Sequence, residues 1–288
     1  MTSVTIRWPD GTVLPAIGQG TWHMGEKSSQ RKAEVAALQR GLDQGLTLID
    51  TAEMYGEGGA EEVVGEALRG RRDSAFVVSK VYPHNASRSA MIQACDRSLR
   101  RLGIDAIDCY LLHWGSSTPT DEIIEGFTRL QEAGKIKGYG VSNLDDRELE
   151  DWWRYDNGQL CQTDQVLYHL GSRGVEYRLL PLLREYQIPM MAYCPLAQGG
   201  RLRQQLMTSS AVGEVAQRHG VTPQQILLAW VIRSQQNQRN VIAIPKAVNL
   251  AHVDANAAAL DIALSPEDLA LLDQEWPAPT RRQPLDVE

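Results

Sequence analysis

Four side chains with acid–base chemistry stand at or just past the ends of segments that we interpret as β-strands. Asp50 ends the segment LTLID, and Tyr55 follows it five positions later in a loop that becomes glycine-rich. Lys80 ends AFVVSK, and His113 ends IDCYLLH. Taken singly, a strand-end Asp or Lys is often a solvated cap, a loop Tyr often packs, and a His beside Leu is often a satisfied core residue. Because three successive strands end in such residues, we interpret them as one site at the mouth of a parallel barrel.

These four residue types together can protonate a carbonyl oxygen. An isolated phenol has a pKa of about 10, so it gives up its proton reluctantly at neutral pH. A lysine ammonium within hydrogen-bond distance favours the phenolate and lowers that pKa, and a carboxylate paired with the lysine keeps the ammonium charged. An imidazole at the same place can hydrogen-bond the substrate oxygen and fix its direction. We therefore expect Tyr55 to be a general acid, assisted by Lys80, Asp50 and His113.

The complement of such a proton donor is a hydride, which no side chain can deliver, so the sequence implies a nicotinamide cofactor. Candidate contacts to its nicotinamide half follow at later strand ends. Ser142, Asn143 and Gln165 carry hydroxyl and amide groups suited to hold a carboxamide, and Tyr193 could stack on the ring. The alternative for the Ser-Asn pair is an ordinary helix cap.

Two later segments could contact the anionic part of that cofactor. Residues 198–201 are glycine-rich and end in a cation, so they could fold over a pyrophosphate. Lys246 follows the strand-like segment VIAIP and could face an anion at the start of the next helix. The alternative for the Gly-Gly-Arg segment is a simple surface turn.

The elements that must position these residues alternate along the chain. A Pro-Asp-Gly turn at residues 9–11 between two β-prone segments predicts an N-terminal hairpin. After it, strands and helices alternate about eight times, which favours a parallel sheet with right-handed crossovers. No G-x-G-x-x-G follows the first strand, so the sequence favours a closed (β/α)8 TIM barrel over a doubly wound dinucleotide fold. No linker divides the chain, and we expect residues 1–288 to form a single domain.

Helix boundaries are predicted from capping residues. Ser28 or Ser29 is expected to cap the helix over residues 28–42, and Ser265 the last helix. Gly103 is expected to end the helix over residues 87–103.

Three later segments are expected to depart from regular helix or strand structure. Pro181 is expected to kink or shorten the helix near residues 175–186. Residues 197–202 are expected to form a loop. The proline-rich residues 277–288 are expected to be irregular and to lie over the surface or the site.

Composition argues against several classes of protein. The 288 residues carry a formal net charge of −7 without a Lys/Arg block, which argues against a nucleic-acid partner. The N-terminal residues lack an apolar h-region, and no run approaches the roughly 18 apolar residues of a membrane span. The four cysteines are scattered, without C-x-x-C or a His pair at metal spacing, so neither a disulfide framework nor a metal site is expected. We expect a soluble, cytoplasmic protein.

The order and spacing of several motifs resemble one known family over essentially the whole chain. The motifs are GQGTW, LIDTAEMYG, VVSKV, YLLHW, GYGVSN, DQVLYH, MAYCPLAQGG, IPKAVNLAHVDAN and LSPEDLALLD. Together they are similar to the aldo-keto reductases, bacterial members in particular. The resemblance implies a (β/α)8 barrel with an N-terminal β-hairpin capping its bottom. It also implies that Asp50, Tyr55, Lys80 and His113 are the catalytic tetrad, with Tyr55 as general acid.

The resemblance further implies which residues contact cofactor and substrate. The residues around the nicotinamide half are Gly20, Thr21, Trp22, Asp50, Ser142, Asn143, Gln165 and Tyr193. Those along the pyrophosphate are Leu196, Gln198, Gly200 and Arg201. Those at the adenosine end are Lys246, Val248, Asn249 and Asn256. The substrate pocket is shaped by Trp22, Tyr55, His113 and Trp114.

The sequence departs from the family pattern at two places in the cofactor site. Family members that favour NADPH usually carry Lys-Ser and then an arginine on the following helix to clamp the 2′-phosphate. Here these positions are Lys246, Ala247 and His252, so one point charge remains but the bidentate guanidinium is lost. We predict NADPH use with weakened discrimination against NADH. Cys194 stands where the family often has serine, which weakens one donor to the phosphate region.

The leading hypothesis is reduction of aldehydes or ketones to alcohols by NADPH, with small α-dicarbonyls such as methylglyoxal among the substrates. Trp22 and Trp114 are expected to form an apolar wall for the carbonyl compound, and the protein is expected to act as a monomer. The alternative is a regulatory subunit that binds a nicotinamide nucleotide with little turnover, against which the intact tetrad argues. A metal-dependent barrel hydrolase would need several His and carboxylate ligands at strand ends, and Lys80 would repel the cation.

Overall fold

A parallel sheet curled into a barrel is the centre of the computed structural model, which describes residues 4–234 and 239–288. Within these residues its eight strands follow one another in chain order, and every neighbouring pair is parallel. The strands are β3 (Gln19–Gly20), β4 (Leu48–Asp50), β5 (Phe76–Val81), β6 (Ile107–Leu112), β7 (Ile136–Ser142), β8 (Cys161–Leu167), β9 (Met190–Tyr193) and β10 (Val241–Ala243).

The first and last strands of this sheet also meet, which closes the barrel. Parallel bridges join Ile17 to Ala243 and Gly20 to Lys246, and the Gly18 N–H donates to the Ala243 carbonyl at 2.8 Å. Glycine is required at position 20 because a Cβ there would lie 2.6 Å from the Ile244 carbonyl oxygen. The predicted (β/α)8 TIM barrel is confirmed.

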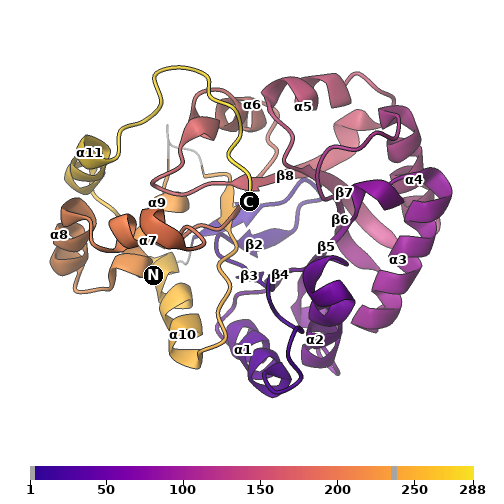
Figure 1. The fold of residues 1–288 in the computed structure, drawn as a ribbon, viewed down its shortest axis with the longest axis horizontal. Coiled ribbons are helices and arrows are strands. Elements are labelled where there is room, and N and C mark those ends of the chain that lie inside the picture. Colours follow the sequence, from indigo (N-terminus) through magenta and orange to yellow (C-terminus); the bar gives the residue numbers. More distant parts are fainter. Residues whose placement is uncertain (1–3, 235–238) are drawn as a thin grey trace.

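Helices surround the barrel (Figure 1). They are α1 (Arg31–Asp43), α2 (Gly59–Ala67), α3 (Arg88–Leu102), α4 (Thr120–Glu132), α5 (Asp146–Trp152), α6 (Leu179–Glu185), α7 (Gly200–Met207), α8 (Ser210–His219), α9 (Pro223–Val231), α10 (Leu250–Ala258) and α11 (Pro266–Glu275). Several ends follow the capping residues of the sequence. Gly103 ends α3 in the left-handed conformation with φ of 63°, and the Ser265 hydroxyl accepts from the Asp268 N–H at the start of α11.

Two local predictions need correction, and one is confirmed. The cap of α1 is Gln30 without a side-chain hydrogen bond, so neither Ser28 nor Ser29 caps it. The expected loop over residues 197–202 is too long: residues 197–199 lie outside any helix or strand, but α7 begins at Gly200, and its Arg, Leu, Gln and Met residues favour a helix. Pro181 does shorten its helix, since it stands as the third residue of α6, where a missing N–H costs no intrahelical bond.

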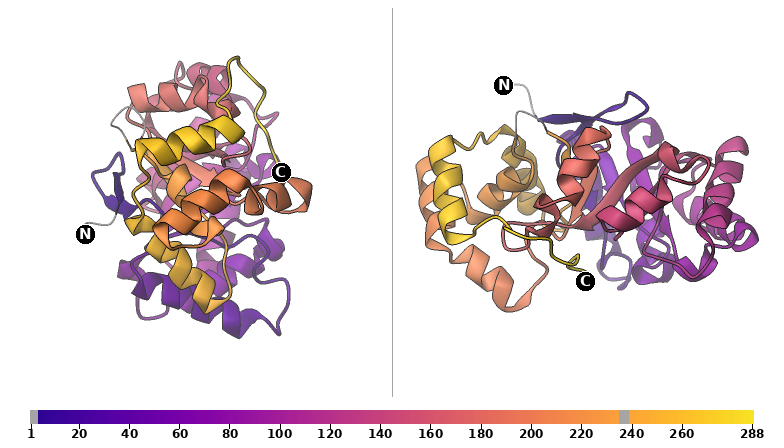
Figure 2. Two further views of the ribbon diagram at one scale, coloured as in Figure 1. Left: turned by 90° about the vertical axis from the view of Figure 1, so that its left-hand side faces the viewer. Right: turned by 90° about the horizontal axis from the view of Figure 1, so that it is seen from above.

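A hairpin covers the amino-terminal end of the barrel. It pairs β1 (Thr5–Arg7) with β2 (Val13–Pro15) in antiparallel register. The Trp8 indole N–H donates to Gln162 Oε1 at 2.9 Å, and the indole packs edge-on against Phe76 at 5.1 Å between ring centroids. Both partners lie at the starts of barrel strands, as expected for a hairpin that caps the bottom. The right-hand view of Figure 2 shows the hairpin at one end of the barrel and the end of the chain at the other.

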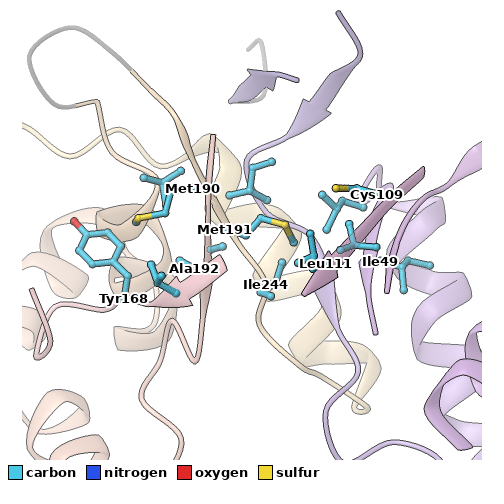
Figure 3. Packing of buried hydrophobic residues seen from close by; sticks show 14 of the residues in the cluster. Ile49, Cys109, Leu111, Tyr168, Met190, Met191, Ala192 and Ile244 are labelled. Carbon is cyan, nitrogen blue, oxygen red and sulfur yellow. The ribbon is translucent and has the colours of Figure 1, made fainter. Parts of the chain in front are cut away.

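Apolar side chains from the strands and the surrounding helices form one buried cluster. Figure 3 shows part of it, with Cys109 and Leu111 of β6 and Met190 and Met191 of β9 among its members. All four cysteines lie in the described part of the chain and are free. Within residues 4–234 and 239–288, no helix is both long and apolar enough to cross a bilayer.

Replacing Trp8 with Ala should lower the free energy of unfolding by about 3 kcal/mol, because it leaves a cavity under the hairpin and Gln162 without its donor. Equilibrium denaturation in urea measures the change. Val13→Ala on the same hairpin is the matched control, since Val13 is 57% exposed and Trp8 only 1%. Equal losses in the two variants would show that the hairpin does not close the barrel base.

Candidate active site

Lys80 is the centre of a buried cluster at the carboxyl ends of β4 and β5. Its ammonium donates to Asp50 Oδ2 at 2.8 Å, to the Thr51 carbonyl at 2.9 Å and to the Tyr55 hydroxyl oxygen at 3.1 Å. The register explains the first contact: Asp50 pairs with Val78, and Lys80 lies two residues further along the same face of β5. The pairing of the two strands therefore places the Asp50 carboxylate next to the Lys80 ammonium.

Tyr55 reaches this point because the chain turns sharply after β4. Its N–H donates to the Ala52 carbonyl at 3.1 Å, and a short 3₁₀ turn over Tyr55–Gly58 follows. Gly56 has φ of 56°, and a Cβ on it would lie 2.9 Å from the Met24 carbonyl oxygen. The glycine lets the two loops pack closely and turns the phenol inward.

Burial dominates the electrostatics of the cluster. It raises the pKa of Asp50 and lowers the pKa of Lys80, and the ion pair between them opposes both shifts. Burial, with the charge of Asp50 second, also raises the pKa of Tyr55 well above its ordinary value of 10. The net shift of the Tyr55 pKa is thus upward, with burial and the Asp50 charge as its main causes, and the lowering expected from the Lys80 ammonium stays a prediction. The phenol keeps its proton at neutral pH, and the neighbouring Lys80 ammonium can stabilise the phenolate that proton donation would leave.

His113 follows β6 and faces the phenol. Its backbone N–H donates to the Val81 carbonyl at 3.1 Å, and the His113 and Tyr55 rings meet edge-on at 5.8 Å between centroids. Burial, followed by the charge of Lys80, lowers the pKa of His113 to about 2. The imidazole is therefore neutral, with one nitrogen free to donate and the other to accept.

Amide and hydroxyl groups from β7, β8 and β9 complete the ring of polar side chains. Gln165 Nε2 donates to Asp50 Oδ1 at 2.7 Å, and the Ser142 hydroxyl donates to the Gln165 carbonyl at 2.8 Å. The Tyr193 hydroxyl donates to Asn143 Oδ1 at 2.8 Å, and Asn143 has φ of 60°. These bonds fix the direction in which each amide can contact a ligand.

A cavity of about 360 Å³ opens above the cluster. It brings together most of the site residues expected from the sequence, and Lys80 is buried beneath it. The expected residues that line it are Gly20, Thr21, Trp22, Asp50, Tyr55, His113, Trp114, Ser142, Asn143, Gln165, Tyr193, Cys194, Leu196, Gln198 and Lys246.

Some expected cofactor residues are not among the described residues that line the cavity. They are Gly200, Arg201, Ala247, Val248, Asn249, His252 and Asn256. The Asn249 side chain accepts from the Ala251 N–H and so caps α10, the helix that carries His252 and Asn256. Of these residues, Ala247 to Asn256 follow Lys246 in the chain, and Gly200 and Arg201 begin α7.

Other lining residues were not identified from the sequence. Arg203, and not Arg201, is the cation from this segment that lines the cavity, and its guanidinium donates to the carbonyls of Leu196 at 3.3 Å and Ala197 at 2.9 Å. A helix prediction for this segment would have distinguished the two arginines, because side chains two positions apart on an α-helix point to different sides. The remaining additions are His23, Met54, Pro195, Ala197, Ile244, Pro245 and Glu288.

The donor set fits a nicotinamide dinucleotide. The side-chain amides of Asn143 and Gln165 and the ring of Tyr193 line the cavity and could contact a carboxamide and a nicotinamide ring. The cations Lys246 and Arg203 also line it. In the part of the chain that the structure describes, no three His, Cys, Asp or Glu side chains are grouped to hold a metal ion.

Comparisons with known proteins agree with this donor set. The sequence model of the Aldo/keto reductase family matches residues 16–276. The chain is 53% identical over 287 residues to methylglyoxal reductase YeaE of Escherichia coli (strain K12), with 100% of both chains covered. Two crystal structures of an aldo/keto reductase from Klebsiella pneumoniae, one in complex with NADP and acetate and one with NADPH, each have a TM-score of 0.96 at 53% identity and cover 100% of both chains.

The depressed pKa of His113 predicts a loss of stability in acid. Below pH 6.5 the unfolded chain binds a proton that the folded imidazole does not bind until about pH 2, so the free energy of unfolding falls as the pH falls. At pH 5 this contribution is about 2 kcal/mol, at roughly 1.4 kcal/mol per pH unit. Urea unfolding at pH 8 and pH 5 should show the wild type losing that much more stability than His113→Gln. Identical losses in the two proteins would contradict a neutral, buried imidazole.

Proposed function

The chain belongs to the aldo/keto reductase family and is thus a nicotinamide-dependent carbonyl reductase, and we propose that it reduces small aldehydes and α-dicarbonyls, such as methylglyoxal, with NADPH. The observation that carries the proposal is the Lys80 ammonium 3.1 Å from a Tyr55 hydroxyl at the floor of the cavity. It supplies a proton donor whose conjugate base is stabilised by a fixed cation.

Different cavity residues would contact different parts of the cofactor. Asn143 and Gln165 would hold the carboxamide, and the Tyr193 ring would support the nicotinamide face. Lys246 and Arg203 would face the phosphates. When bound, NADPH supplies the hydride that the side chains of the site cannot deliver.

The tetrad performs the proton half of the reaction. The neutral His113 imidazole donates a hydrogen bond to the substrate carbonyl oxygen and orients it toward Tyr55. Tyr55 releases its proton to that oxygen as negative charge develops there. Lys80 stabilises the phenolate left behind, and Asp50 keeps the ammonium charged and directed at the phenol oxygen.

The wall of the cavity near the tetrad supports small carbonyl substrates. The Trp22 ring lies 6.5 Å from the Tyr55 ring and the Trp114 ring 4.7 Å from the His113 ring, between centroids, and Met54 also lines the cavity. These apolar surfaces exclude water around the carbonyl group. A relative with 53% identity is named a methylglyoxal reductase, which supports an α-dicarbonyl as substrate. We also propose a monomeric, cytoplasmic protein with residues 1–288 as one domain.

Replacing Tyr55 with Phe should lower kcat for methylglyoxal by about 10²–10⁴-fold, because it removes the proton donor and leaves the cavity shape. NADPH oxidation followed by absorbance measures the rate, and quenching of tryptophan fluorescence measures NADPH binding, which should be unchanged. Tyr177→Phe, at an exposed tyrosine, is the matched control. A native protein that binds NADPH but turns over no carbonyl compound would favour the regulatory-subunit alternative.

Replacing His252 with Arg should tighten NADPH binding about tenfold, because a guanidinium can contact a 2′-phosphate through two donors. The dissociation constant for NADH should stay the same, since NADH lacks that phosphate, and so it serves as the internal control. Titration of both cofactors against both proteins gives the four constants. Tighter binding of NADH than of NADPH by the native chain would contradict the predicted cofactor preference.

A further inference from the structure

The segment after α11 crosses the mouth of the barrel and ends in the cofactor cavity. In the right-hand view of Figure 2 this segment runs from α11 to the end of the barrel opposite the hairpin. Glu288 lines the same cavity as Asp50, Tyr55 and Gln165, and it is exposed, so it lies on the open side. A residue far from the tetrad in sequence thus shares its cavity.

Glu288 interacts with three residues that the cofactor is expected to contact. The Gln198 side-chain amide is assigned the orientation in which both its oxygen and its nitrogen have suitable hydrogen-bond partners. In that orientation its nitrogen donates to Glu288 Oε2 at 2.7 Å and to Oε1 at 3.3 Å. A backbone contact from Glu288 also opposes the rise that burial gives to the pKa of the Tyr193 phenol. The Glu288 charge also adds to burial in raising the pKa of Cys194 to about 12.

The preceding residues tether this segment to the barrel. Arg282 donates to Asp146 Oδ1 at 3.0 Å and to Asp145 Oδ2 at 2.7 Å, both at the start of α5. The Ser172 hydroxyl donates to Asp286, and Leu285 packs against the buried cluster. Residues 282–288, which we call the strap, are thus fixed at several points over the cavity.

The position of Glu288 conflicts with a bound dinucleotide. Gln198 can satisfy either the Glu288 carboxylate or a phosphate, and a carboxylate beside a pyrophosphate is repelled by its negative charge. We propose that Glu288 is an internal competitor for the cofactor cavity, and that NADPH binds only when the strap moves Glu288 out of it. This inference rests on the proposed function, because it assumes that the cavity takes NADPH.

A competitor of this kind weakens the apparent affinity for NADPH, because the apparent dissociation constant is the intrinsic one divided by the fraction of molecules in which the strap is open. Glu288→Gln removes the charge but keeps the shape, and Arg282→Ala releases the tether. Both variants should bind NADPH about three- to tenfold more tightly than the native chain, measured by quenching of tryptophan fluorescence. Arg281→Ala is the matched control, since Arg281 is an exposed neighbour of the same charge, and it should bind like the native chain.

Hydrogen exchange gives a second readout that does not depend on a variant. Adding NADPH to the native protein should speed exchange of the strap amides, because displacement breaks the contacts of the strap. Slower exchange with NADPH, or weaker NADPH binding by Glu288→Gln, would overturn the proposal and make the strap a clasp over the cofactor. Unchanged binding by both variants would also overturn it. If the native chain and the variants all failed to bind NADPH, the proposed function itself would be wrong.

Discussion

The buried ion pair between Lys80 and Asp50 is the interaction on which the rest of the site depends. Lys80 is 0% exposed, and an unpaired ammonium at such a place would lose several kcal/mol of hydration. Its three N–H groups meet three acceptors, namely Asp50, the Thr51 carbonyl and the Tyr55 hydroxyl oxygen. Because every donor is used, the ammonium cannot turn away, and the phenol oxygen is held where the third N–H points.

The same pair sets the charge of its neighbours. Burial makes each interaction in the cluster stronger than it would be in water, so the positive Lys80 adds to the cost of a second cation at His113. The imidazole is held neutral, while the phenol is held protonated by burial and by the charge of Asp50. The site therefore contains one buried ion pair, one neutral imidazole and one protonated phenol, which are the groups that the proposed mechanism uses.

The closed barrel brings these groups together from distant parts of the sequence. Asp50 and Lys80 lie on neighbouring strands, so parallel pairing alone accounts for their contact. Gln165 comes from β8, which is not a neighbour of β4, yet its amide donates to Asp50 at 2.7 Å. That contact exists because the sheet curls until strands meet across its interior, and Gly20 permits the close approach that completes the ring.

Much of the fold and of the tetrad could be predicted from local signals. Alternating strands and helices predicted the barrel, and polar residues at strand ends singled out Asp50, Lys80 and His113, because each strand, helix and strand end is recognised from a few neighbouring residues. The helix stop at Gly103 and the cap at Ser265 were equally local, since each depends on one turn of backbone.

By itself, then, the sequence determined the order of the elements, the strand ends that meet at the mouth and the family to which the chain belongs. Only the tertiary structure decided that Arg203 rather than Arg201 reaches the cavity, that Glu288 enters it, and that burial raises the pKa of Tyr55 although Lys80 lies beside it. The physical reason is the same in each case. Burial and contact between residues far apart in the chain depend on how whole elements pack, and no short stretch of sequence carries that information.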